Sequence, residues 1–158
     1  MRRYVKWLAV VICLVGLAWG AGGAWAADAV VGSGTAASCT EAAFDAALTT
    51  AQTGGGTITF NCGPGVATVP FTVFKTIILG NVTIDGGGRI ILNANNTDRH
   101  FFAGNGVTFR LRHITLRDGS SLVGGGAIEA SGADVILEDV ALINNLSLIH
   151  ISEPTRPY

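Results

Sequence analysis

Charged residues are scarce in this sequence. Asp, Glu, Lys and Arg make up 13% of the 158 residues, the formal net charge is -1, and 49% of the residues are hydrophobic. A protein that binds nucleic acid needs a clustered basic excess to neutralise phosphates, and the sequence has none. The composition therefore argues against nucleic acid as a partner, and the length is that of a single domain.

Long apolar runs are also few, and the clearest one lies at the N-terminus. Arg2, Arg3 and Lys6 precede it, and Ala24-Trp25-Ala26 follows it with the small residues of a cleavage site. This layout predicts a secretory signal peptide over residues 1–26 and a secreted or cell-surface protein. A membrane anchor is the alternative, because about 20 apolar residues can span a bilayer.

Cysteine occurs three times, and Cys13 leaves with the predicted signal peptide. The remaining pair, Cys39 and Cys62, has no neighbouring His, which argues against a zinc site. Because oxidising compartments favour disulfides, we expect this pair to form one structural bridge. Two buried free thiols are the alternative.

The pattern of the chain changes after Asn145. Residues 146–158 resemble a translated transposase adapter from sequencing-library preparation, and a segment of that origin was never selected to fold. We therefore expect residues 27–145 to be the native part of a protein that is truncated in this sequence.

A helix is predicted near the start of the native part, in the N-terminal segment 27–56. Ser38 and Glu41 fit a capping box, in which each side chain satisfies a free amide at the start of a helix. An apolar face of helical spacing follows and predicts an amphipathic helix from Ser38 to Gln52. Its apolar residues are Phe44, Ala47, Leu48 and Ala51.

From Thr57 onward the apolar residues alternate with polar ones, which is typical of strands, and no second helical pattern occurs before Asn145. The predicted strands are short, rich in β-branched and aromatic residues, and bounded by Gly, Asn or Asp. They are residues 57–60, 82–84, 89–92, 107–111 and 135–137.

Three of these regions share one template, in residues 79–86, 111–118 and 137–144. Each has an apolar residue, two polar or small residues, and then two apolar residues separated by one position. In a flat strand the two-residue step would turn the later side chains to the other face, so it predicts a corner. The template recurs after 32 residues (79 to 111) and 26 residues (111 to 137), which places Leu79, Leu111 and Leu137 on successive coils.

This self-similarity predicts an all-β fold built of stacked coils over residues 57–145, a parallel β-helix whose open end the helix would cover. We expect the apolar residues at 109, 111, 114 and 116 to stack against those at 135, 137, 140 and 142. An antiparallel sandwich is the alternative.

Several segments carry a resemblance to a known family: Ile84-Asp85-Gly86-Gly87, residues 107–119, the tetrad 125–128 (Gly-Gly-Ala-Ile) and residues 140–145. They resemble the right-handed parallel β-helix proteins of the pectin-lyase-like superfamily, and in particular exported bacterial proteins related to the polymorphic outer-membrane proteins. The resemblance implies an adhesin-like scaffold that binds glycans, such as a polysaccharide, or a cell-surface protein. The protein would then contact a membrane only during export or through an anchor in the missing C-terminal part.

The alternative that the superfamily offers is a polysaccharide lyase or glycoside hydrolase whose catalytic coils lie beyond Asn145. We predict no catalytic, cofactor or metal residues in this stretch, and Ca²⁺ would be expected only for a lyase. Residues 96–98 superficially match the first catalytic motif of polygalacturonases, but the later motifs do not follow, so we expect a turn. We expect His100 to be an ordinary turn residue as well.

Basic residues gather between Arg110 and Arg117 and are the candidate binding site. Alternation points Arg110 and Arg112 outward, so an external groove could attract carboxylates or sulfates. The alternative is that Asp118, Glu138 and Asp139 neutralise these cations across adjacent coils, with Glu138-Asp139 forming a solvated bend. The candidate groove residues are Arg110, Arg112, His113 and Arg117.

Overall fold

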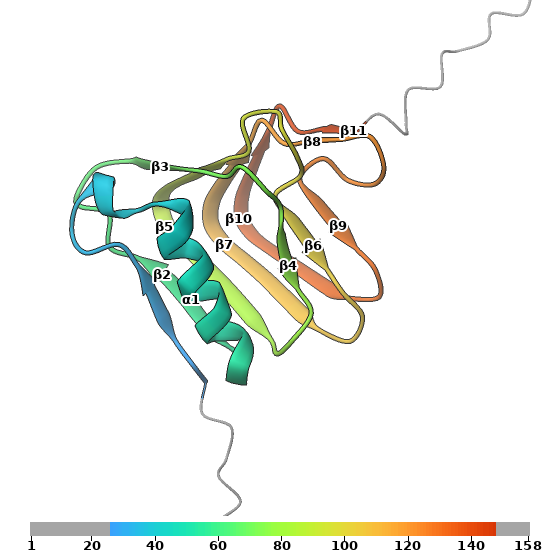
Figure 1. The fold of residues 1–158 in the computed structure, drawn as a ribbon, viewed down its shortest axis with the longest axis horizontal. Helices are drawn as coiled ribbons and strands as arrows, with labels where there is room; N and C mark the ends of the chain where they lie inside the picture. The colour runs from blue at the N-terminus through green and yellow to red at the C-terminus, as the bar shows by residue number, and fades with distance from the viewer. Residues whose placement is uncertain (1–25, 148–158) are drawn as a thin grey trace, which may run out of the picture.

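A computed structural model describes residues 26–147 (Figure 1). The predicted signal peptide lies outside these residues, except for Ala26. The predicted adapter-like tail, residues 146–158, also lies outside them, except for Leu146 and Ser147, which form a short strand. Within residues 26–147, no helix combines the length and hydropathy needed to cross a membrane.

The described residues form one 3-10 helix, one α-helix and eleven strands. In chain order the elements are β1 (Ala29–Val31), η1 (Ala36–Ser38), α1 (Glu41–Gly54), β2 (Gly56–Phe60), β3 (Ala67–Pro70), β4 (Lys75–Ile77), β5 (Val82–Asn93), β6 (Phe101–Ala103), β7 (Thr108–Arg117), β8 (Ser120–Ser121), β9 (Ile128–Ala130), β10 (Asp134–Ile143) and β11 (Leu146–Ser147).

The strands form three parallel sheets. The largest has the order β1-β2-β5-β7-β10, with β3 also paired to β5, and the others are β4-β6-β9 and β11-β8. Figure 1 shows β2, β5, β7 and β10 side by side. Every strand pair in the described part of the chain is parallel, so the antiparallel sandwich alternative is wrong.

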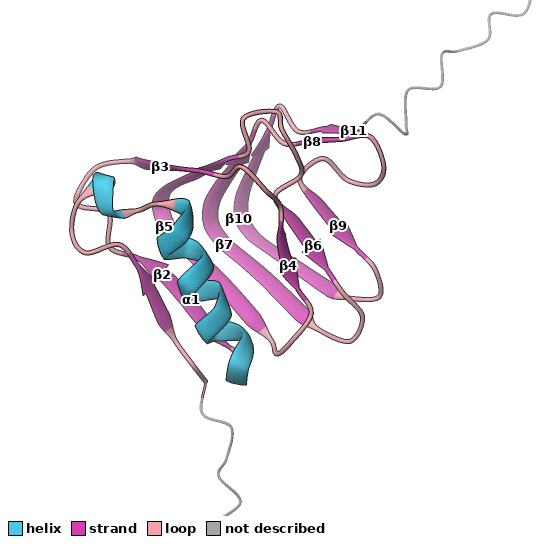
Figure 2. Cartoon of the chain, in the orientation of Figure 1, coloured by secondary structure: helices cyan, strands magenta, loops and turns pink. Residues whose placement is uncertain are grey.

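The predicted fold class, an all-β parallel β-helix, is also wrong, because the chain is mixed α and β with parallel sheets. Helix α1 lies beside β1 and β2 (Figure 2) and forms part of the common core. The ring of Phe44 is fully buried, 4.9 Å from the ring of Phe71 and 6.3 Å from that of Phe101. The sequence predicted only that the helix would cover the open end of the stacked coils. In the structure its apolar face packs among residues of the strands.

The helix begins two residues later than the predicted capping box. Thr40 is the N-cap, and its Oγ1 accepts a hydrogen bond from the Ala43 amide at 3.2 Å. The Ser38 hydroxyl instead accepts from Ser33 N and donates to Thr35 O. Glu41 extends to the segment before β4, so the predicted exchange of caps between Ser38 and Glu41 does not occur.

The register of β5, β7 and β10 corrects the predicted template. Leu111 lies between Ile84 and Leu137, whereas Leu79 precedes β5 and is 62% exposed. The template failed because β5 has residues 86–89 between the paired positions 85 and 90, where β7 has His113 alone. The predicted stacking of β7 on β10 is confirmed by the pairs Phe109↔Val135, Leu111↔Leu137, Ile114↔Val140 and Leu116↔Leu142.

The bends at residues 112–113 and 138–139 lie where the sequence predicts them. His113 (φ 47°) and Asp139 (φ 51°) both have left-handed backbone conformations, which turn the strand so that the next apolar residue points inward again. In β5 the glycines Gly87 (φ 57°) and Gly88 (φ 75°) form the equivalent bend without strain from a Cβ atom.

The predicted pairing of Cys39 with Cys62 is confirmed. Their sulfur atoms lie at disulfide distance and their Cα atoms are 5.6 Å apart, across a sequence separation of 23 residues. Closing a loop of this size removes denatured-state entropy worth about 3 kcal/mol. The bridge thereby ties the start of α1 to the end of β2.

Candidate functional site

The outer face of β5, β7 and β10 carries six ionisable side chains in neighbouring positions. In β7, Phe109 and Leu111 are buried, so alternation turns Arg110 and Arg112 outward as predicted. The register puts Asp85, Arg112 and Glu138 in one row across the three strands. We call this set the charged ladder, and its members are Asp85, Arg110, Arg112, His113, Glu138 and Asp139.

The two arginines of the ladder pair with carboxylates on opposite neighbours. Nη1 of Arg110 lies 2.6 Å from Oε1 of Glu138 on β10, and Nη2 of Arg112 lies 2.7 Å from Oδ2 of Asp85 on β5. Acidic residues of adjacent strands therefore neutralise these cations, which agrees with the alternative interpretation of the sequence. A ladder of paired charges attracts anions far less than a bare basic groove would.

The ring of His113 lies between two carboxylates at the bend of β7. Its Nδ1 is 3.1 Å from Oδ1 of Asp85, and its Nε2 is 3.5 Å from Oδ2 of Asp139. Because both ring nitrogens face acidic groups of this chain, His113 is placed to hold strands together. Asp85 is the partner that the sequence pattern did not reveal for it.

Asp85 is the best-held carboxylate of the ladder. Burial raises its pKa, but hydrogen bonds from the Gly87 amide, His113 and Arg112, together with the charge of Arg112, outweigh burial and hold the pKa below its ordinary value. The group is thus an acceptor fixed by three donors. An acid that must give up a proton near neutral pH needs the opposite shift.

The fourth candidate, Arg117, is not part of the ladder. It lies after the bend of β7, where its Nε is 2.7 Å from Oδ2 of Asp118. Arg117 and Asn144 donate to Asp118, and these bonds lower the pKa of that carboxyl group. The structure therefore brings three of the four predicted groove residues together and leaves Arg117 apart.

Two shallow hollows flank the glycine bend of β5. Each has a volume of about 200 Å³; one includes His113 and Asp139, and the other includes Asp85 and Arg89. Pockets that enclose small molecules are typically about 300–1,000 Å³. The outer face is therefore a surface with small depressions rather than an enclosed site.

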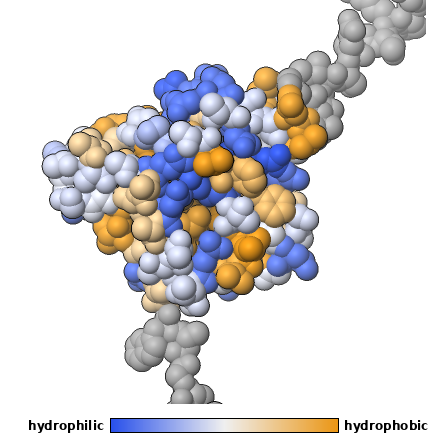
Figure 3. Space-filling view, in the orientation of Figure 1, coloured by the Kyte–Doolittle hydropathy of each residue, from blue (hydrophilic) through white to orange (hydrophobic). Residues whose placement is uncertain are grey.

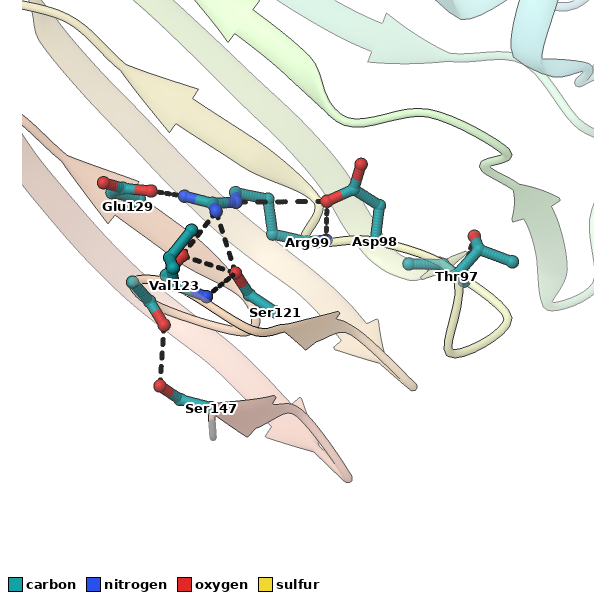
Figure 4. A network of polar contacts seen from close by, with 9 residues as sticks. Thr97, Asp98, Arg99, Ser121, Val123, Glu129 and Ser147 are labelled. Atoms are coloured by element: carbon teal, nitrogen blue, oxygen red, sulfur yellow. Dashed lines mark hydrogen bonds and ion pairs between the residues drawn. The ribbon is translucent and has the colours of Figure 1, made fainter. Parts of the chain in front are cut away.

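A second polar cluster surrounds Arg99, a residue to which the sequence gave no role (Figure 4). Arg99 forms an ion pair with Glu129, and its Nη2 donates to Ser121 Oγ at 2.8 Å and to the Val123 carbonyl. Its guanidinium also lies 5.8 Å from the ring of Phe74. Arg99 is largely buried, so this cluster fixes β9 and the loop after β8 to the start of β6.

Residues 96–98 form the expected turn. Asn96 has a φ of 57°, Thr97 Oγ1 donates to the Ala94 carbonyl at 2.7 Å, and Asp98 Oδ1 accepts from the Arg99 amide at 2.8 Å. All three residues serve the local backbone or its neighbours, in agreement with a structural role.

His100 lies at a bend before β6, as expected, but it is not an ordinary turn residue. Its side chain is fully buried, with Nε2 3.0 Å from the Leu92 carbonyl. Burial lowers its pKa, and the contact with the Leu92 carbonyl offsets this only in part. His100 thus belongs to the core, where the apolar rings of Phe71 and Phe101 lie 6.2 and 6.3 Å away.

Metal ligands do not cluster in residues 26–147, where no three His, Cys, Asp or Glu side chains are placed to hold one ion. No family model, curated protein or solved structure matches this chain. The resemblance to the polymorphic outer-membrane proteins accordingly stays a prediction from the sequence.

Proposed function

We propose that this protein is an exported scaffold, secreted or held at the cell surface, that binds glycans or proteins through the outer face of β5, β7 and β10. The observation that carries the proposal is the charged ladder, which fixes donors and acceptors on three strands in register. The predicted signal peptide and the Cys39–Cys62 pair support export, because disulfides persist in oxidising compartments.

The ladder suits a ligand that carries many hydroxyl groups. Each guanidinium has five N–H donors, and the ion pairs of Arg110 and Arg112 engage one nitrogen of each. The paired carboxylates keep acceptor lone pairs beside these donors. Sugar hydroxyls donate and accept, so they match such mixed pairs, whereas a strongly anionic ligand would meet Asp85, Glu138 and Asp139.

The shape of the face supports an extended ligand. Neighbouring strands lie about 4.8 Å apart, so equivalent side chains repeat at that spacing across the sheet. The hollows beside the ladder are small, and the ladder lies on strands and not on loops. A polymer that crosses several strands can contact more of this surface than a small molecule can.

Binding to immobilised neutral and acidic polysaccharides tests the proposal, with Arg112→Ala as the main variant. A hydrogen bond from a charged group contributes about 1.5–3 kcal/mol, so we expect the variant to lose about tenfold or more in affinity for the polysaccharide that binds. Arg117→Ala is the matched control, because Arg117 is also half-exposed and paired with an adjacent carboxylate but lies off the ladder. It should change affinity less than twofold.

Two results would reject the proposal in different ways. Absence of binding across a broad panel of glycans and surface proteins would remove the binding function, and equal losses for both arginine variants would remove the ladder as its site. Release of reducing ends or unsaturated products from the same polysaccharides would instead support the lyase or hydrolase alternative.

A further inference from the structure

His100 connects the sheet β4-β6-β9 to the largest sheet. Its carbonyl oxygen accepts a hydrogen bond from the Lys75 amide of β4 at 2.8 Å, and its own amide donates to the Ala127 carbonyl at 3.0 Å. Its side chain reaches the largest sheet, where Nε2 lies 3.0 Å from the Leu92 carbonyl of β5. We call these three contacts of His100, with Lys75, Ala127 and Leu92, the His100 joint.

The surroundings of the ring at this joint suit its neutral form. Because a carbonyl oxygen only accepts, Nε2 carries the proton that it donates to Leu92. Nδ1 is buried and has no hydrogen-bond partner among the described residues. A second proton would therefore lie on Nδ1 without an acceptor, and it would place a charge on a residue that is 0% exposed.

The charged groups around the joint are held in ion pairs of their own. These pairs are Lys75 with Glu41 and Asp45, Arg99 with Asp98 and Glu129, and Arg117 with Asp118. The charge of Asp118 favours a protonated His100 ring, but burial outweighs it and holds the pKa of His100 below its ordinary value of 6.5. Phe71, Leu92 and Ala127, which approach His100 from other segments, do not titrate.

The strands that meet at the joint are short and carry apolar residues on their outer side. β4 and β6 pair over three positions, Lys75–Ile77 with Phe101–Ala103. Phe74 is 41% exposed and Ile78 is 54% exposed, and Figure 3 shows apolar side chains interrupting the polar surface over β4 and β6. A region held by few backbone pairs can open locally at a lower free energy than the whole domain unfolds.

We propose that the His100 joint is an acid-sensitive device: when the ring takes up a second proton, β4 and β6 separate from β5 and the apolar core beneath them opens to water. In the opened state water accepts the hydrogen bond of the new N–H group, which no described residue does in the closed state. The joint lies off the charged ladder and does not depend on the function proposed for that face.

The direction of the pH dependence follows from proton binding. The opened state exposes His100 to water and binds a proton near pH 6.5, whereas the closed state does so only at lower pH. Opening is therefore independent of pH well above 6.5, and below it the equilibrium constant for opening rises by up to about tenfold per pH unit until the closed ring also titrates. Glu41 acts mainly below pH 4.5, outside this range.

Hydrogen exchange of backbone amides, followed by NMR in isotopically labelled protein, measures the opening. The reporter is the Lys75 amide, which donates to His100, and the reference is the Asn61 amide, which donates to Val31 away from the joint. After correction for the intrinsic pH dependence of exchange, protection of Lys75 should fall at least about threefold from pH 7.5 to pH 5. Protection of Asn61 should change less than about twofold.

Variants assign the effect to the ring. His100→Gln keeps an N–H donor for the Leu92 carbonyl but does not titrate, so protection of Lys75 should vary less than about twofold over the same pH range. His113→Asn is the matched control, because it removes the half-exposed histidine of the ladder and Asn tolerates the left-handed backbone there. It should keep the fall at Lys75.

The ring nitrogen chemical shifts of the wild-type protein give a second measurement that needs no substitution. At pH 6 they should be those of a neutral His100 ring with its proton on Nε2. A ring that becomes charged while the Lys75 amide stays protected would overturn the proposal, even if His100→Gln did not fold.

Three results of the exchange experiment would also overturn it. They are protection of Lys75 that does not change with pH in the wild type, equal falls at Lys75 and Asn61, and a fall that persists in a folded His100→Gln protein. Equal falls would show that acid unfolds the whole domain and does not open the joint.

Discussion

Replacing Leu111 with Asp is expected to unfold the protein. Leu111 is fully buried between Ile84 and Leu137 on the adjacent strands. The substitution removes an apolar side chain, worth about 2–5 kcal/mol for a large-to-small change, and places an unpaired carboxyl group in the core at a cost of several kcal/mol more. The sum is comparable to the total stability of a typical domain, about 5–15 kcal/mol.

Leu137→Asp is the matched control, because it makes the same chemical change one strand further along the same row. Since Leu137 is 44% exposed, water can solvate the new carboxylate, and we expect a loss of about 1–2 kcal/mol. Circular dichroism with urea titration measures both variants. A folded Leu111→Asp protein with the stability of the Leu137 variant would show that residue 111 is not in the core.

Replacing Glu41 with Gln is expected to cost about 2 kcal/mol at neutral pH. The carboxylate of Glu41 lies 2.6 Å from Nζ of the buried Lys75 and accepts hydrogen bonds from Thr72 and Val73. Loss of one partner leaves the Lys75 charge less compensated in a buried position. Lys75 keeps Asp45 at 2.8 Å, which limits the cost.

The same contacts predict a pH dependence. Burial raises the pKa of Glu41, but the Lys75, Thr72 and Val73 hydrogen bonds outweigh it and lower the pKa from 4.5 to about 2. A carboxyl group with a lowered folded-state pKa contributes its full stability above its unfolded pKa and loses it as pH falls through the folded one. The contribution should therefore disappear between about pH 4.5 and pH 2.

Urea unfolding at several pH values measures this effect. The shift corresponds to about 3 kcal/mol at most, and because water reaches 19% of the Glu41 side chain we expect about 2 kcal/mol. The gap between wild type and Glu41→Gln should shrink to near zero at pH 2. Asp45→Asn, which changes the half-exposed partner of Lys75, should cost less than about 1 kcal/mol. A gap that stays constant with pH would show that Glu41 is not held by these donors.

Local features of the fold are predictable from the sequence because they depend on neighbouring residues. Alternation in β7 correctly turns Arg110 and Arg112 outward, and the polar step at residues 112–113 correctly marks a bend. The helical face around Phe44 is also correct, although the helix begins at Glu41.

Features that depend on distant residues are missed. The template placed Leu79 beside Leu111 because it allowed no insertion, and the additional residues of the glycine bend in β5 shift the true partner to Ile84. The core role of α1 depends on contacts of Phe44 with Phe71 and Phe101, and no periodicity in the sequence reports such contacts.

The candidate site also combines features that the sequence predicts with contacts between distant residues that it does not predict. The sequence locates the cations of β7, but their partners lie 27 and 28 residues away, so pairing could not be decided before the register was known. Arg99 and Glu129 form their ion pair across β6 and β9, and neither residue belongs to a recognisable motif.

The order and register of β5, β7 and β10 support the proposed binding face, and backbone nuclear Overhauser effects in isotopically labelled protein test them most directly. We expect cross-peaks between backbone protons that link residues around Arg112 both to those around Asp85 and to those around Glu138, in the pattern of parallel strands. Strong Hα–Hα cross-peaks typical of antiparallel pairing, or contacts of β7 with any other pair of strands, would contradict the account.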